Sequence, residues 1–530
     1  MARQLSRVGV VGLGTMGAGI AEVLAGSGLQ VVGVEVAQDA LDRGRGHVER
    51  STERAVTRGK LAAGQRDAIL DRLTFCTGLG ALADVELVVE AVPERLEVKR
   101  SLFAELDRIC PPETILATNT SSLPVIDIAV ATGRPARVLG MHWFNPAPVM
   151  GLVEVVGTVR TDPAVLDDVA ALATRAGKTA VRVGDRAGFI ANALLFGYLN
   201  AAAALYEARV ARREDIDAAM KVAVGFPMGP LTLLDLIGLD TAYEILETMY
   251  RSTRDRLHAP APILRQLVTA GLLGRKTGRG FYTYDGTADF RPMAEVVGPR
   301  PVRRVGVVGT GWPADAIAAA LTGAGYDVRA IDPADDLAAL FDRELVVVAV
   351  DAALNPARLD SALGPDSVLA LVPPAGTPVV RLPAPAARRG DVVGLRWHAL
   401  PLVEVAATVA TAPAAAAAVR AVFESTGRTV IACRDRAGLV VDALLFPHLN
   451  DAVRMLESGY ASAADIDRAM KLGCGYPVGP FELLDRIGPD VARSAQSAIY
   501  RVTPEPGLAP APLLEAMAIT GRSFSEPAGG

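Results

Sequence analysis

The fold of the first half is decided by Val8-Gly9-Val10-Val11-Gly12-Leu13-Gly14-Thr15-Met16-Gly17, which an Ala- and Leu-rich helical segment follows as far as Ala25. A short apolar strand that runs through such a glycine turn into a helix is typical of dinucleotide-binding α/β domains. The first glycine allows the tight turn, the second lets the backbone approach a pyrophosphate, and the third lets helix and strand pack closely. The pattern predicts that the cofactor is bound by Gly12, Leu13, Gly14, Thr15, Met16 and Gly17.

An acidic residue, Glu35, ends the second predicted strand, Val31 to Val34. A carboxylate at this place accepts hydrogen bonds from the ribose diol of NAD and repels the 2′-phosphate of NADP. The sequence therefore predicts NAD as the cofactor and Glu35 as one of its contacts. An ordinary glycine turn in an α/β domain is the competing interpretation of so short a motif.

The composition indicates a protein with large hydrophobic cores. Its 530 residues suffice for about three or four domains, and 51% hydrophobic against 21% charged residues exclude disorder for most of the chain. The net charge of -5 provides no basic surface for nucleic acid. The beginning of the chain runs into a strand rather than a signal sequence, and no apolar run is long enough to span a membrane. We expect a cytoplasmic protein with neither nucleic acid nor membrane as partner.

The cysteines and histidines give no sign of a metal centre. The four cysteines are scattered without a Cys-x-x-Cys pair, and none of the five histidines stands at metal-ligand spacing from another. We therefore expect reduced thiols and no metal.

Two short segments, Asn119 to Ser122 and Met141 to Pro146, carry groups suited to proton transfer. His142 can take a proton near neutral pH, the carboxylate of Glu154 can fix its tautomer, and the Ser121 hydroxyl can hold a substrate oxygen. Both segments follow predicted strands, so they should meet at the sheet edge where doubly wound folds bind ligands. A histidine beside aromatic residues is more often a satisfied core residue, and the cofactor turn is what favours a catalytic role.

Residues 40–72 are charged and helical, and Gly59 and Gly64 are predicted to divide them into a helical hairpin. Arg58 lies in a cluster of basic side chains there. The cluster is interpreted either as a solvated helix face or as a seat for a phosphate-bearing substrate.

Beyond about residue 185 the pattern becomes helical, which predicts a second, all-α domain that closes over the cofactor. A long apolar helix is expected over 189–206, followed by helices over 216–222 and 231–237. Asn192, a polar residue in the first of them, either caps a neighbouring backbone group or reaches a ligand.

The sequence then starts again. Arg304 to Gly311 repeats Arg7 to Gly14, and Asp435 to Gly438 repeats Asp185 to Gly188. The spacing before Glu344, which matches Glu86, is too short to hold the charged hairpin. The whole chain is therefore a duplication whose second copy lacks that hairpin.

The second copy has lost the groups proposed for chemistry. Arg396 stands in place of His142 and Asp442 in place of Asn192, while Glu404 keeps the carboxylate. Pro313 lies inside the repeated glycine turn, where it removes a backbone donor that a phosphate needs. We expect no turnover in this copy and a packing role for its helices.

Residues 1 to about 285 resemble the (S)-3-hydroxyacyl-CoA dehydrogenases, including the 3-hydroxybutyryl-CoA dehydrogenases of bacteria. The resemblance rests on the glycine turn, the two segments around Ser121 and His142, Gly225 to Pro230, and Gly274 to Tyr282. The duplicated layout resembles longer bacterial members, among them the 3-hydroxyadipyl-CoA dehydrogenases of phenylacetate breakdown. It implies NAD-dependent oxidation of a short-chain or dicarboxylic (S)-3-hydroxyacyl-CoA to the 3-oxoacyl-CoA, and the reverse.

The resemblance also implies roles for individual residues. His142 is the expected base with Glu154 as its partner, and Ser121 and Asn192 are expected to contact the reacting oxygen. The further cofactor contacts implied are Glu94, Lys99, Asn145 and Lys276, and those of coenzyme A are Ser51 and Arg58.

The expected organisation is an α/β Rossmann doubly wound domain plus an all-α C-terminal domain, duplicated as a degenerate second copy. Its predicted domains are 1–185 (NAD-binding, with the hairpin), 186–285 (helical), 286–300 (linker), 301–432 (degenerate Rossmann-like) and 433–530 (helical, non-catalytic). Residues 433–520 are expected to pack on residues 186–285 as an internal pseudo-dimer, since both carry the same apolar helices. Two alternatives stay open: a dehydrogenase of free 3-hydroxy acids, and a non-enzymatic binding or structural protein that keeps a relic of the fold.

Overall fold

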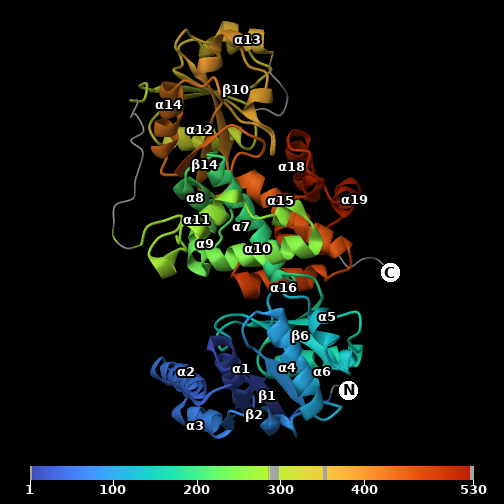
Figure 1. The fold of residues 1–530 in the computed structure, drawn as a ribbon. Coiled ribbons are helices and arrows are strands. Elements are labelled where there is room, and N and C mark those ends of the chain that lie inside the picture. Colours follow the sequence, from blue (N-terminus) through green and yellow to red (C-terminus); the bar gives the residue numbers. More distant parts are fainter. Residues whose placement is uncertain (1–2, 285, 287–297, 350–354, 526–530) are drawn as a thin grey trace. The chain divides into compact units, whose positions relative to one another are not determined.

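The computed structural model, drawn in Figure 1, describes residues 3–284, 286, 298–349 and 355–525. These residues form two compact units. Unit 1 comprises Met1–Leu195, Arg251–Arg254 and Met455–Phe481, and unit 2 comprises Phe196–Tyr250, Asp255–Arg454 and Glu482–Gly530. The predicted domains follow the order of the chain, whereas the compact units take segments from both halves. Residues 287–297 of the predicted linker lie outside the described residues.

Unit 1 is built around an eight-stranded sheet in the order β3-β2-β1-β4-β5-β6-β7-β8. Every neighbouring pair is parallel except β6 and β7, which run antiparallel. The central strands are continuous apolar runs because helices bury both faces of the sheet. The strands are β1 (Arg7–Val11), β2 (Gln30–Val34), β3 (Leu73–Cys76), β4 (Leu87–Glu90), β5 (Ile115–Thr118), β6 (Val138–Trp143), β7 (Leu152–Gly157) and β8 (Thr179–Gly184).

Two separate cores confirm that this sheet is doubly wound. One face is covered by α1 (Thr15–Gly26), α2 (Gln38–Thr57), α3 (Ala63–Asp71) and α6 (Pro163–Arg175). The other face is covered by α4 (Leu96–Ile109), α5 (Val125–Ala129) and the short turn η1 (Leu79–Leu82). The predicted helical hairpin is present as α2 and α3, with the break at Gly59. The second predicted break, at Gly64, is wrong, because Gly64 lies in the first turn of α3.

Unit 2 contains the second sheet, which has seven strands in the order β10-β9-β11-β12-β13-β14-β15. Between β10 and β11 the chain forms only a short turn, η5 (Leu337–Leu340), where the first half has α2, α3 and β3. Helices α12 (Ala314–Gly323) and α14 (Pro413–Glu424) pack on this sheet, with α13 (Pro356–Ala362) near η5. The strands are β9 (Arg304–Val308), β10 (Asp327–Ile331), β11 (Leu345–Val348), β12 (Val368–Leu371), β13 (Val392–Trp397), β14 (Leu402–Ala407) and β15 (Thr429–Arg434).

The remaining segments are helical in both halves, as predicted. The first half provides α7 (Ala191–Glu207), α8 (Arg213–Ala223), α9 (Pro230–Ile237), α10 (Leu239–Thr253) and α11 (Pro262–Thr269). The second half provides α15 (Val441–Glu457), α16 (Ala463–Cys474), α17 (Pro480–Ile487), α18 (Pro489–Val502) and α19 (Pro512–Thr520). No helix within the described residues is long and apolar enough to cross a membrane.

Two helices pack on the sheet that the other half of the chain provides. In unit 2, α8 lies against β14 and β15, and the backbone nitrogen of Arg434 donates to the oxygen of Val210 over 2.7 Å. In unit 1, α16 lies against β7 and β8, and the Tyr460 hydroxyl donates to the backbone oxygen of Gly184 over 2.7 Å. Each sheet is therefore covered in part by a helix from the other half of the chain.

Candidate active site

The register of the one antiparallel pair in the first sheet places His142 opposite Glu154. Side chains of directly opposed residues emerge on the same face of a sheet. The two groups meet there, with His142 Nδ1 2.7 Å from a carboxylate oxygen of Glu154. His142 is 5% exposed and Glu154 is fully buried. Because Nδ1 is engaged by the carboxylate, Nε2 is the ring nitrogen left to exchange a proton with a ligand.

The second carboxylate oxygen of Glu154 is held by the segment that opens α7. It accepts hydrogen bonds from the backbone nitrogens of Ile190 and Ala191 over 3.1 and 3.0 Å. Amides at the start of a helix favour a negative charge. The carboxylate is thus fixed at both oxygens, and its orientation fixes the imidazole.

A cavity of about 330 Å³ lies in front of this pair and is lined by six of the predicted site residues. Met16, Glu94 and Asn145 come from the predicted cofactor contacts, and Ser121, His142 and Asn192 come from the predicted chemistry. Ala91, Val92, Asn119, Trp143 and Phe144 complete its lining. No cluster of three or more potential metal-binding side chains occurs in the part of the chain that the structure describes.

Ser121 and Asn192 reach this cavity from different elements, the loop after β5 and the first turn of α7. The Asn192 amide donates to the backbone oxygen of Ser121 at 3.4 Å. Of the two roles open to Asn192, contact with a neighbouring backbone group is therefore present, and the residue also lines the cavity. Its expected contact with the reacting oxygen stays a prediction.

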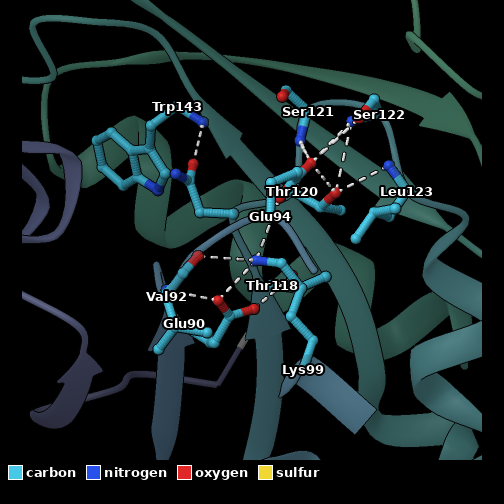
Figure 2. Close-up of polar contacts among 11 residues, drawn as sticks. Glu90, Val92, Glu94, Lys99, Thr118, Thr120, Ser121, Ser122, Leu123 and Trp143 are labelled. Atoms are coloured by element: carbon cyan, nitrogen blue, oxygen red, sulfur yellow. Dashed lines mark hydrogen bonds and ion pairs between the residues drawn. The ribbon is translucent and has the colours of Figure 1, made fainter. Parts of the chain in front are cut away.

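The loop after β5 is held by the carboxylate of Glu94 (Figure 2). This carboxylate accepts hydrogen bonds from the Thr120 hydroxyl at 2.6 Å and the Ser121 nitrogen at 2.9 Å, and it lies 3.3 Å from the Lys99 ammonium. Desolvation alone raises the pKa of Glu94, but the Lys99 charge and these hydrogen bonds outweigh it, so the pKa is lowered. Glu94 thus stays ionised and positions the Ser121 backbone.

Lys99 is buried beneath the loop rather than exposed in the cavity. It is 1% exposed, and its ammonium lies 2.7 Å from a carboxylate oxygen of Glu90, which is fully buried. The other oxygen of Glu90 accepts the Thr118 hydroxyl at 2.7 Å (Figure 2). The predicted contact of Lys99 with the cofactor stays a prediction. Its ion pair with Glu94 connects Lys99 to the lining of the cavity.

The glycine turn fits a dinucleotide. At Gly12, where φ is +86°, a Cβ atom would lie 2.9 Å from the backbone of Ala91, and at Gly17 it would lie 1.7 Å from the Gly12 oxygen. At Gly14 it would meet no atom within 4 Å, so that side of the turn is open. Gly14 starts α1 without a side-chain cap, which leaves the amides of the first turn available to a phosphate.

Glu35 lies at the end of β2 beside the same turn. Its carboxylate accepts hydrogen bonds from the backbone nitrogens of Leu13 at 2.6 Å and Val36 at 3.1 Å. The acid thus stands next to the glycine turn, as a ribose contact requires.

A second cavity in unit 1, of about 630 Å³, lies between the hairpin, α1 and the loops after β6 and α6. It is lined by both predicted coenzyme A contacts, Ser51 and Arg58, and its further charged residues are Glu22, Arg54, Lys60, Arg175 and Lys178. Glu22 is the one acidic side chain in this basic lining, and burial raises its pKa. The cavity favours a ligand with phosphate groups.

Lys276 belongs to unit 2, unlike the other predicted cofactor contacts. Its ammonium pairs with the Asp240 carboxylate at 2.5 and 2.6 Å.

The second half has rearranged the groups that correspond to the His142 pair. Arg396 lies opposite Glu404 in the strand register, yet its guanidinium pairs with Asp442 at 3.2 Å. Glu404 instead binds His398 Nε2 at 2.8 Å, and His398 corresponds to Phe144. Asp442 and Pro374 stand at the positions that correspond to Asn192 and Ser121, and the expected loss of turnover stays a prediction.

Sequence reasoning gave no role to Asn119 and Phe144, which shape the site. The side-chain oxygen of Asn119 accepts a hydrogen bond from the backbone nitrogen of Trp143 at 2.9 Å and so connects the loop after β5 to the end of β6. The Phe144 ring packs on the His142 imidazole with centroids 4.6 Å apart. The sequence indicated these two residues only by placing them in the segments Asn119 to Ser122 and Met141 to Pro146.

Family models match most of the chain. The 3-hydroxyacyl-CoA dehydrogenase NAD-binding domain matches residues 7–186, and the C-terminal domain of the same family matches residues 188–284 and again 438–527.

Proteins with similar sequences have names that agree with this family. The chain is 35% identical to the 3-hydroxyadipyl-CoA dehydrogenase of Escherichia coli over 89% of both chains. It is 48% identical to the 3-hydroxybutyryl-CoA dehydrogenase of Mycobacterium tuberculosis over 54% of this chain and all of that protein. Among solved structures, a 3-hydroxybutyryl-CoA dehydrogenase from Escherichia coli covers 98% of this chain and 99% of its own, at 31% identity and a TM-score of 0.78.

Proposed function

This chain belongs to the 3-hydroxyacyl-CoA dehydrogenase family, and from that premise we propose how its first half works and which substrates it accepts. It is an enzyme that oxidises 3-hydroxyacyl-CoA with NAD. The observation that carries the mechanism is the buried His142–Glu154 pair facing a cavity that Met16 of the glycine turn also lines.

The first step of the mechanism is a proton transfer to His142. Nε2 takes the proton of the substrate 3-hydroxyl group, while Nδ1 keeps its contact with Glu154. NAD, when bound, supplies the acceptor for the hydride that leaves C3. In the reverse direction His142 returns the proton. General-base catalysis of this kind contributes about 10²- to 10⁴-fold.

The other groups of the cavity position the reacting oxygen. Glu154 stabilises the imidazolium that forms, since its own carboxylate is fixed by two backbone amides. The Ser121 hydroxyl and the Asn192 amide hydrogen-bond the oxygen while its charge changes, and dipoles that are already oriented stabilise such a charge best.

Coenzyme A binds in the basic cavity of the hairpin. Arg58 pairs with a phosphate group and Ser51 hydrogen-bonds to it, and the remaining basic side chains of the cavity add to the attraction. A free 3-hydroxy acid lacks the phosphate groups of coenzyme A, so the hairpin favours thioesters over free acids.

The acyl group is short or dicarboxylic. The half-length relative is named for 3-hydroxybutyryl-CoA and the relative that spans both halves for 3-hydroxyadipyl-CoA. The two names bracket the substrates to be compared, and the (S) configuration is expected at C3.

The second half takes the place of a partner subunit. Its support is the pair of covering helices, α8 on β14 and β15 and α16 on β7 and β8. In unit 2 the rings of Tyr198 from α7 and His448 from α15 also lie 5.7 Å apart, and Arg256 pairs with Glu505 at 3.3 Å.

The function is tested with NADH absorbance on a panel of 3-hydroxybutyryl-CoA, 3-hydroxyadipyl-CoA and the corresponding free acids. We expect turnover of at least one thioester and little of either acid. His142→Gln is expected to lower kcat by about 10²-fold or more while NADH still binds, as measured by fluorescence. Arg396→Gln, at the corresponding position of the second half, is the matched control and should keep full activity.

Two results would contradict this proposal. Unchanged kcat in His142→Gln removes the assigned base, and equal kcat/KM for acid and thioester removes the role of the hairpin. Binding of NADH without turnover of any panel member would favour the non-enzymatic alternative.

A further inference from the structure

The second half of the chain reaches the rear of the catalytic strands through α16. This helix packs on β7, which carries Glu154, and on β8 beside it. Just before α16, the ring of Tyr460 stacks on the Arg186 guanidinium, whose central carbon lies 4.6 Å from the ring centroid. All of these residues belong to unit 1.

At its C-terminal end, α16 touches the aromatic wall of the catalytic cavity. A Cβ atom on Gly473 would lie 3.0 and 3.2 Å from two ring carbons of Phe144, and 2.9 Å from a methyl carbon of Leu152. Phe144 in turn lines the cavity and packs on the His142 ring, with centroids 4.6 Å apart and planes inclined by 55°. Phe144 is thus held between the imidazole on one side and α16 on the other.

The electrostatics place the same helix end close to the carboxylate. Burial raises the pKa of the Cys474 thiol, and the charge of Glu154 raises it further. The same charge is among the causes that raise the pKa of Tyr460. The charge of Glu154 therefore acts on two groups from the second half, Cys474 and Tyr460.

The first half has a bulkier residue at the position that matches Gly473. There α8 ends in Ala223 and covers the degenerate sheet, in which His398 replaces Phe144. Glycine, which has no side chain, thus stands at position 473, where α16 contacts Phe144 of the intact site.

We propose that the second half completes the active site of the first, with Gly473 as a positioning residue that sets the orientation of His142 through the Phe144 ring. This inference rests on the proposed role of His142 as the base. A side chain at Gly473 pushes the ring toward the imidazole, and a displacement of about 1 Å in a reacting group can lower a rate by about 10²-fold.

The test is a series at this position in the full-length chain, assayed with the thioester that the panel selects. Gly473→Val is expected to lower kcat by about 10- to 100-fold and to shift the pH profile of kcat, because the imidazole leaves its place beside Glu154. The KM of the thioester should stay close to that of the parent. Gly473→Ala, which adds one methyl group, should lower kcat by a smaller factor and is decisive if the valine variant does not fold.

Two controls separate positioning from packing. Ala223→Val adds bulk at the matching point of α8 and should leave kcat unchanged. Phe144→Leu shortens the side chain between helix and imidazole, so adding Gly473→Val to it should lower kcat much less than it does in the parent.

The inference is overturned if Gly473→Ala and Gly473→Val both keep the kcat and pH profile of the parent. A fall in thermal stability without a fall in kcat would likewise reduce Gly473 to a packing residue. Failure of the base assignment is distinct, since His142→Gln would then retain turnover whatever the Gly473 variants do.

Discussion

Lys99 shows how a residue can serve a ligand site without lining it. The cofactor contact that the family resemblance implies stays a prediction, and the structure buries the Lys99 ammonium between the carboxylates of Glu90 and Glu94. Glu94 then holds the Ser121 backbone (Figure 2). Burial depends on the packing of α4 against the sheet, which residue types alone do not reveal.

Lys99→Met is expected to destabilise the first half and weaken cofactor binding together. Removing one partner of a buried pair leaves the Glu90 charge uncompensated, which costs about 3 to 5 kcal/mol. We expect a lower Tm in calorimetry and a higher Kd for NADH. Lys221→Met, at an exposed position of α8, is the control. An unchanged Tm would show that the Glu90 charge is compensated in another way.

At the scale of elements, what could be predicted depended on whether the signal was local. The break at Gly59 and the glycine turn are set by neighbouring residues, and both are confirmed. The pairing of His142 with Glu154 arises from an antiparallel register between β6 and β7 in an otherwise parallel sheet. The sequence predicted Glu154 as the partner of His142, but only the strand pairing makes the two residues direct neighbours.

The hairpin gives a prediction for Arg58, which follows the last residue of α2. Arg58→Ala is expected to raise the KM for the CoA thioester roughly fivefold to tenfold, as expected for the loss of about 1 kcal/mol at a solvated phosphate contact. The Kd for NADH should not change. Arg43→Ala is the matched control, since Arg43 lies on the same helix and pairs with Asp39 in solvent.

The effect of Arg58→Ala should also shrink as ionic strength rises, because salt screens exposed charges. An equal loss in Arg43→Ala, or an unchanged KM in Arg58→Ala, would assign the hairpin cavity to another ligand.

At the scale of the whole molecule, the duplication and its missing hairpin could be predicted because repeated residues keep their order and spacing. The crossing of α8 and α16 to the opposite sheets could not, since matching sequences in both halves are equally compatible with two independent copies. Ala223 and Gly473 differ by one methyl group. The sequence alone does not show that Gly473 lies against Phe144 and Leu152.

Deletion of residues 301–530 is expected to yield a fragment that self-associates. It retains the length of the half-size relative, but α8 loses its cover and exposes Ile216, Ala219 and Met220, which are fully buried in the complete chain. Light scattering after gel filtration should show dimers or aggregates. A soluble monomer with full activity would contradict the proposed pseudo-dimer.

Helices α8 and α16 each pack on the sheet of the other half, and both halves belong to a single polypeptide. A dimer of separate subunits comes apart when the protein is diluted, whereas a tethered pair keeps the same local concentration at any dilution. For the proposed pseudo-dimer we therefore expect a rate per mole of chain that is independent of enzyme concentration. If the second half has no turnover, as the sequence predicts, its packing surface is the feature that this tethering preserves.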